Sequence, residues 1–149
     1  MTEHRTPGPG DRLAIRDDSD VAVARRRVRE LGAQEALPPP KIAALETAIT
    51  EIARNILVHA GKGDISFGTL TDGGRRGVAV LARDWGPGIA DVAQAMQDGY
   101  STGDGLGLGL AGARRLVDEF EIDSVVGAGV TVTLKQWNDA IDWGWDKPL

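Results

Sequence analysis

Apolar side chains recur along the chain in two rhythms, and each rhythm predicts a different element. Between residues 41 and 60 the apolar positions repeat at spacings of three and four, which is the period of one face of a helix. These positions are Ile42, Leu45, Ile49, Ile52 and Ile56. Prolines at 38–40 favour the start of this helix, since proline fits a first helical turn, and Gly61 favours its end. We therefore predict a long helix over Lys41–Ala60.

Shorter patterns on either side of this helix predict the remaining elements. The predicted strands are Arg12–Arg16, Asp64–Leu70, Gly77–Arg83 and a region over Ser124–Trp137, and the predicted helices are Val21–Leu31, a short one near Ala90–Gln97, and Leu110–Phe120. Because helices come in pairs and strands in hairpins, we expect an α/β (α+β) two-layer sandwich, with one mixed β-sheet and helices packed on one face.

The chain divides by composition into a polar start, one domain and an aromatic end. Residues 1–11 are rich in Pro and Gly, which predicts a disordered tail. A single domain is expected over 12–137, since 149 residues is an ordinary domain length. The extension 138–149 holds Trp143 and Trp145, large aromatics that either cover the domain's own sheet or anchor a partner.

Charge and cysteine content exclude several classes of function. The net charge of −5 disfavours a nucleic-acid partner, because such binding depends on neutralising phosphates. The chain has no cysteine, so disulfides and thiolate chemistry are excluded. No apolar run approaches the roughly 18 residues of a membrane span, and the first residues lack a signal segment. We therefore expect a cytoplasmic protein with neither a membrane nor a nucleic acid as partner.

Two polar residues lie on the long predicted helix, beside its apolar stripe. Glu51 and Asn55 are four apart, so they lie one turn apart on the same face, beside the small Ala48. Magnesium prefers oxygen ligands and keeps several waters, so one side-chain oxygen together with nucleotide phosphates suffices to hold it. The other interpretation of such a pair is two solvated polar residues.

Glycines follow an apolar strand at Asp84-Trp85-Gly86-Pro87-Gly88. Glycine lets a backbone approach a flat ring closely, and an aspartate at a strand end can accept a hydrogen bond from an exocyclic amine such as that of adenine. For this segment alone, a tight turn with Asp84 as its local hydrogen-bond partner is the simpler interpretation.

A second glycine pattern, Gly105-Leu106-Gly107-Leu108-Gly109-Leu110, directly precedes a predicted helix. Backbone N–H groups at a helix start suit phosphate. Two better-known phosphate motifs do not fit. The dinucleotide fingerprint fails because no clear strand precedes the glycines and Val132 stands where its acidic residue belongs. Gly61-Lys62 lacks the rest of a P-loop.

In combination the three patterns become specific. Glu-x-x-x-Asn on a helix, then Asp-x-Gly-x-Gly after a strand, then Gly-x-Gly-x-Gly opening a helix resembles, in order and separation, the GHKL ATPase superfamily. Over residues 12–137 the chain is most similar to the RsbT-type serine/threonine kinases. The similar stretches are those around 50–55, Ala60-Gly61-Lys62-Gly63, Asp98-Gly99-Tyr100-Ser101-Thr102 and 115–120.

The resemblance implies a role for each matching residue. Glu51 would be the general base and Asn55 the ligand of Mg²⁺, while residues 89–104 would form a lid. The implied nucleotide contacts are Asn55, Asp84, Gly86, Gly88, Ser101, Thr102, Gly105, Gly107 and Gly109. The late strand departs from the family's Gly-Thr, since Val130 follows Gly129 and the threonine stands at 131. In the family that threonine helps to bind adenine. Side chains alternate along a strand, so Thr131 could make the same contact with adenine only if the backbone shifts.

Two functions remain open from the sequence. The first is an ATP- and Mg²⁺-dependent kinase that phosphorylates a Ser or Thr of a STAS-domain protein in a stress-signalling pathway, with a phosphatase or sigma-factor regulator downstream. The second is an anti-sigma-factor-like module that binds ATP and switches partners without phosphoryl transfer. An intact Glu51 favours the first. A motor-type ATPase needs further domains, which 149 residues do not accommodate.

Overall fold

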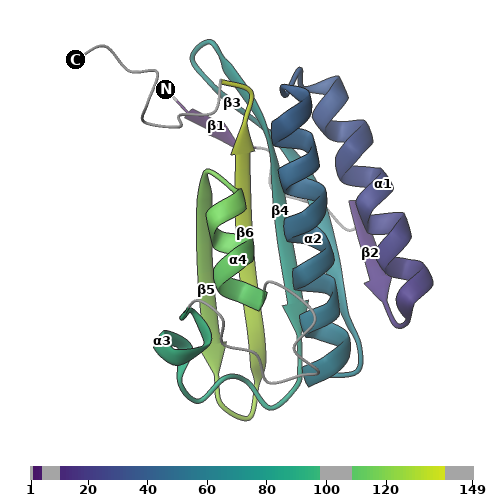
Figure 1. Ribbon diagram of the computed structural model, residues 1–149, viewed down its shortest axis with the longest axis vertical. Helices are drawn as coiled ribbons and strands as arrows, with labels where there is room; N and C mark the ends of the chain where they lie inside the picture. The colour runs from purple at the N-terminus through teal and green to yellow at the C-terminus, as the bar shows by residue number, and fades with distance from the viewer. Residues whose placement is uncertain (1, 5–10, 98–108, 140–149) are drawn as a thin grey trace.

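The computed structural model describes residues 2–4, 11–97 and 109–139, which form two layers (Figure 1). The strands are β1 Thr2–His4, β2 Arg12–Ile15, β3 Gly63–Asp72, β4 Arg75–Asp84, β5 Glu119–Val125 and β6 Gly129–Trp137. The helices are α1 Asp18–Gln34, α2 Pro39–His59, α3 Val92–Ala95 and α4 Gly109–Leu116. In Figure 1, α1, α2 and α4 lie in front of the same face of the sheet. The predicted two-layer architecture is confirmed.

The sheet has six strands in the order β1-β3-β4-β6-β5, with β2 also paired to β3. Every described strand pair is antiparallel, whereas we expected a mixed sheet. Part of the reason is local: two residues join β3 to β4 and three join β5 to β6, and connections this short force the strands they join to be antiparallel. Gly73, at φ 61°, supplies the left-handed backbone of the first turn.

The two long helices begin as their sequences dictate. At α1, the Asp17 carboxylate accepts hydrogen bonds from the N–H groups of Ser19 and Asp20. In return, the Asp20 carboxylate accepts hydrogen bonds from the N–H groups of Asp17 and Arg16. The hydrogen bond from the Ser19 side chain lowers the pKa of Asp17. At α2 two prolines occupy the first turn, and the predicted stripe is buried from Leu45 through Ile56. These helices pack against each other and present their stripes to the sheet.

The core lies between the layers, and strand alternation decides which side chains reach it. In β4 and β6, the even-numbered residues Val78, Val80, Ala82, Val130, Val132 and Leu134 belong to the main core cluster. The odd-numbered residues of the same strands therefore face away from the helices. This assignment matters below, because Asp84 is even-numbered and Thr131 is odd-numbered.

A buried polar network joins the ends of the elements far from the end of β4. Gln136 is 1% exposed; its Nε2 donates to the carbonyls of Lys41 and Leu116, and its Oε1 accepts from the N–H of Asp118. The ammonium of Lys41, which is 2% exposed, donates to Asp118 Oδ2 at 2.7 Å and to the Asp139 carbonyl at 3.0 Å. Buried polar groups that find partners in this way fix the relative positions of α2, α4 and β6.

Three parts of the chain differ from the sequence-based expectation. Residues Thr2–His4 pair with β3, although no strand was expected before residue 12. The fourth helix ends at Leu116 rather than at Phe120, because Phe120 pairs with Leu134 as part of β5. Beyond β6, the Asn138 N–H donates to the Arg76 carbonyl, so the extension begins as a continuation of the sheet.

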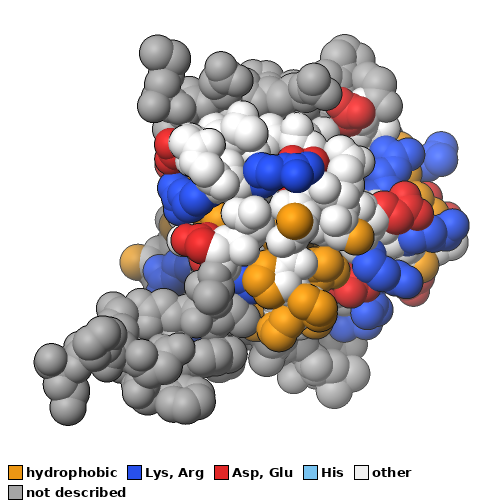
Figure 2. Space-filling model, turned by 90° about the horizontal axis from the view of Figure 1, so that it is seen from above, with side chains coloured by type: hydrophobic (Ala, Val, Ile, Leu, Met, Phe, Trp, Pro, Cys, Tyr) orange, Lys and Arg blue, Asp and Glu red, His pale blue; other side chains and the backbone are white. Residues whose placement is uncertain are grey.

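The end of the molecule that carries the β3–β4 turn has positive and negative side chains mixed on its surface. Figure 2 looks down on this end, where Lys and Arg side chains lie among Asp and Glu, with a small hydrophobic group between them. Across the described ranges 2–4, 11–97 and 109–139, none of the helices is both long enough and apolar enough to cross a membrane.

Candidate nucleotide-binding site

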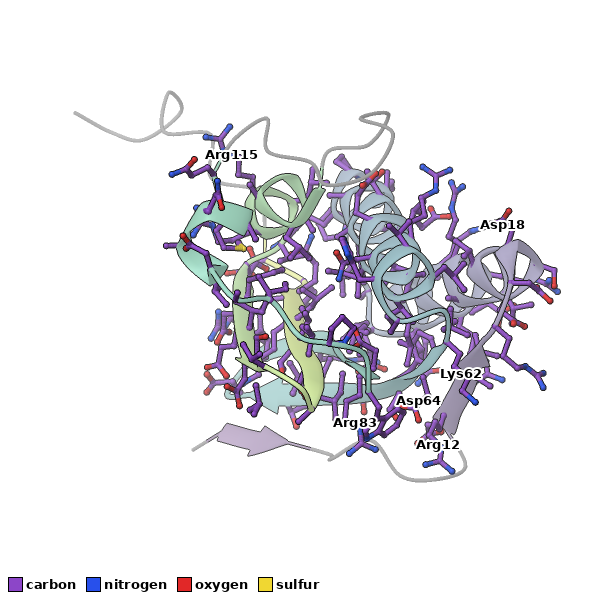
Figure 3. The ribbon with its side chains drawn as sticks, turned by 90° about the horizontal axis from the view of Figure 1, so that it is seen from below. Arg12, Asp18, Lys62, Asp64, Arg83 and Arg115 are labelled. Carbon is purple, nitrogen blue, oxygen red and sulfur yellow. The ribbon has the colours of Figure 1, made fainter. Side chains whose placement is uncertain are left out.

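Three segments that are far apart in the sequence meet at the end of the sheet where β4 finishes. They are the second half of α2, the loop that follows Asp84, and the start of α4 (Figures 1 and 3). Each contains one of the sequence patterns singled out above. The fold therefore brings the helix pair, the first glycine pattern and the last glycine of the second pattern to one end of the domain.

Glu51 and the start of α4 are in direct contact. The Glu51 Oε2 accepts a hydrogen bond from the Gly109 backbone N–H at 3.1 Å, across 58 residues of sequence. Gly109 has a φ of 70°, which favours glycine at this first helical position. Asn55 is half-buried on the same helix, one turn closer to the loop after β4. Glu51, Asn55 and the α4 amide thus line the same side of α2.

Asp84 ends β4 on the helix side of the sheet and is 5% exposed. Its Oδ1 accepts from the Gly86 N–H at 2.9 Å, so the tight-turn interpretation of this segment is correct as far as it goes. A carboxylate accepts hydrogen bonds at both oxygens, so the turn leaves capacity for an amine. The turn therefore fixes the orientation of the carboxylate rather than competing with ligand binding.

The loop after Asp84 is packed so closely that side chains would not fit at Gly86 and Gly88 within it, nor at Gly129 at the start of β6. A Cβ on Gly86 would lie 2.7 Å from the Ala60 Cβ, and one on Gly88, whose φ is 80°, would lie 2.6 Å from the Val125 carbonyl oxygen. A Cβ on Gly129 would lie 2.0 Å from the Asp84 carbonyl oxygen. The loop is held between the end of α2 and the β5–β6 turn.

Sequence reasoning missed Ser124, which ties this loop to β5. Its hydroxyl accepts from the Ile89 N–H at 2.7 Å and donates to the Ile89 carbonyl at 3.2 Å, while the Gly127 N–H donates to the Pro87 carbonyl at 2.8 Å. No local pattern marks Ser124, because its partner is 35 residues away. The one signal in the sequence was a serine within a strand, a polar residue that needs a hydrogen-bond partner when it is half-buried.

The structure does not bring Thr131 to Asp84. Thr131 pairs with Arg83 on one side and Asp123 on the other, and it lies on the face of the sheet away from the helices. Figure 3 shows Arg83 and its neighbour Asp64 on that far side. The buried Val130 occupies the helix side instead. The backbone does not shift here, so the side chains of β6 alternate regularly and Thr131 points away from Asp84.

Four predicted contacts lie outside the described residues: Ser101, Thr102, Gly105 and Gly107. Among the described ones, Glu51, Asn55, Asp84, Gly86, Gly88 and Gly109 are gathered at one end of the domain.

The donor set at this end fits a magnesium nucleotide. Glu51 already shows that the Gly109 amide holds an anionic oxygen, and the closely packed glycines leave backbone rather than side chains beside Asp84. No group of three or more His, Cys, Asp or Glu side chains in the described part of the chain is arranged to hold a metal ion alone. A magnesium ion with the Asn55 oxygen as one ligand would therefore take its remaining ligands from phosphate and water.

Comparison with known proteins agrees with this arrangement. Residues 15–136 match the model of the histidine kinase-like ATPase domain. The chain is 41% identical, over 125 residues, to the serine/threonine-protein kinase RsbT of Bacillus subtilis, and the match covers 84% of this chain and 94% of that protein. It is 28% identical over 120 residues to an anti-sigma F factor of a Thermoanaerobacter species, covering 76% of this chain and 82% of that one.

A solved structure supports the fold alone. The RsbU and RsbW domains of a Mycobacterium tuberculosis protein superpose with a TM-score of 0.53 at 23% identity. The match covers 89% of this chain and 33% of the solved one.

Proposed function

The chain belongs to the histidine kinase-like ATPase family, and from this premise we propose that it is a protein kinase that transfers the γ-phosphoryl group of ATP to a serine or threonine hydroxyl. The observation that carries the proposal is Glu51, a carboxylate on α2 in direct contact with the first amide of α4. The similarity to RsbT and to anti-sigma F factors supports a kinase-like regulator that switches partners. We propose a STAS-domain protein as the phosphate acceptor.

Each side chain at the site has a task that follows from its chemistry. Asp84, oriented by the Gly86 N–H, would accept a hydrogen bond from the adenine amine. Asn55 would offer its oxygen to Mg²⁺, and the Gly109 amide would donate to phosphate. Bound ATP supplies the activated phosphoryl group, and magnesium neutralises part of its charge.

Glu51 would accept the proton of the attacking hydroxyl. The hydroxyl oxygen forms a bond to the γ-phosphorus as the bond from that phosphorus to the bridging oxygen breaks. The products are the phosphorylated partner and ADP, and the proton leaves on the Glu51 carboxylate. Most of the rate in such transfers comes from positioning and charge neutralisation, so the base contributes about 10²–10⁴-fold.

The test separates a kinase from a module that only binds nucleotide. The protein is incubated with γ-labelled ATP, Mg²⁺ and a STAS-domain protein, and label is measured on protein and as free phosphate. We expect label on a Ser or Thr of the acceptor and a loss of about 10²–10⁴-fold in rate for Glu51→Ala, which must still bind nucleotide. Nucleotide binding without any label on protein would favour the second candidate, an ATP-binding anti-sigma-like module, which the 28% identical relatives support.

A further inference from the structure

Glu51 carries out a structural task that a general base does not need. Its Oε2 accepts from the N–H of Gly109, the residue that begins α4. The first N–H groups of a helix have no partner inside the helix, and the positive end of the helix dipole favours an anion there. In this structure, the carboxylate therefore caps α4 in the manner of a bound anion.

The same N–H is the last of the second glycine pattern, the one expected to hold phosphate. A backbone N–H carries one hydrogen, and two anionic oxygens placed on it would also repel each other. We infer that Glu51 occupies the position of a phosphate oxygen at the Gly109 amide, and that the phosphates of a bound nucleotide displace it. This inference rests on the proposed function, and it concerns how the same site is regulated.

Displacement has two consequences. Nucleotide binding must break a charge-assisted hydrogen bond, so Glu51 lowers the affinity for any nucleotide whose phosphate takes that amide, and leaves adenosine unaffected. The carboxylate is also released to accept a hydroxyl proton only after the phosphates have arrived. The base is thus withheld from the partner's hydroxyl until the phosphoryl donor is in place.

The competing explanation is plain repulsion between the Glu51 charge and the phosphates, without a shared amide. Shortening the side chain distinguishes the two. Glu51→Asp keeps the charge but retracts the carboxylate by one methylene, so it no longer reaches Gly109. Glu51→Ala removes both the charge and the contact. Glu46→Ala, on the same helix and paired with Arg29, is the matched control for losing a carboxylate on α2.

The experiment measures affinity for the ATP analogue AMP-PNP with Mg²⁺, and for adenosine, by calorimetry. We expect Glu51→Asp and Glu51→Ala both to bind AMP-PNP roughly three- to thirtyfold more tightly than the parent, with adenosine unchanged. Glu46→Ala should bind both like the parent. Unfolding of a variant lowers apparent affinity, so it does not mimic the expected gain.

An NMR readout follows the amide itself. The Gly109 N–H resonance should differ between the parent and Glu51→Asp in the free proteins and coincide once AMP-PNP is bound, because phosphate is then the partner in both. Parent-like AMP-PNP affinity in Glu51→Asp, or Gly109 resonances that still differ with AMP-PNP bound, would overturn the inference. Tighter binding in a protein that transfers no phosphate would instead refute the proposed function and leave this inference standing.

Discussion

Replacing Gln136 should lower the stability of the domain substantially without touching the site. In Gln136→Leu, an apolar side chain of similar size replaces an amide that is 1% exposed. The Asp118 N–H and the Leu116 carbonyl, at the end of α4, lose their partners. The Lys41 carbonyl keeps its helical partner and loses only a second bond. At about 1–3 kcal/mol for each of these two stranded groups, less about 1 kcal/mol from added apolar burial, the net loss is about 1–5 kcal/mol.

Urea denaturation followed by circular dichroism measures this loss. For a domain of this size it corresponds to a fall of roughly 3–20 °C in melting temperature. Nucleotide affinity measured well below the transition should not change, because Gln136 pairs with Val78, six residues along β4 from Asp84. The exposed Gln94→Leu is the control. A loss below about 0.5 kcal/mol would show that the stranded groups find other partners, and the reasoning would be wrong.

Three further predictions concern the site and the extension. Asp84→Asn should weaken ATP binding by about 1–3 kcal/mol and reduce the preference for ATP over GTP, measured by calorimetry, since guanine presents a carbonyl where adenine presents an amine; equal parental affinities for ATP and GTP would contradict this. Ser124→Ala should raise the Kd for ATP roughly two- to tenfold by releasing Ile89, and Ser124→Thr should restore part of it. Deleting 138–149 should lower the melting temperature by a few degrees more than deleting 140–149, because only the longer deletion removes the contacts of Asn138 with Arg76 and of Asp139 with Lys41.

Local patterns were enough to predict most elements and where several of the candidate site residues lie on them. The stripe of α2, the turn at 73–74 and the pairing of Glu51 with Asn55 on one face all depend on residues within a few positions of each other. The alternation rule also placed Thr131 correctly relative to Asp84, since it needs only the strand. Where a strand begins was harder: Phe120 continues an apolar helical pattern, and only its pairing with Leu134 makes it part of β5.

The contacts that sequence reasoning missed all join distant segments. Glu51 reaches Gly109 across 58 residues and Ser124 reaches Ile89 across 35. The tightness around Gly129 depends on the Asp84 carbonyl of a neighbouring strand. Such contacts are set by the packing of the whole domain, so no single window of sequence indicates them.

The two edges of the sheet limit how a partner can be recognised. On one side β3 is covered by β1 and β2, strands of only three and four residues. On the other, β5 carries the exposed acids Glu119, Glu121 and Asp123. Short and charged edges resist pairing with an incoming strand. A protein partner that added a strand to this sheet would therefore find no favourable edge on either side. This architecture favours recognition through side chains over recognition by strand addition.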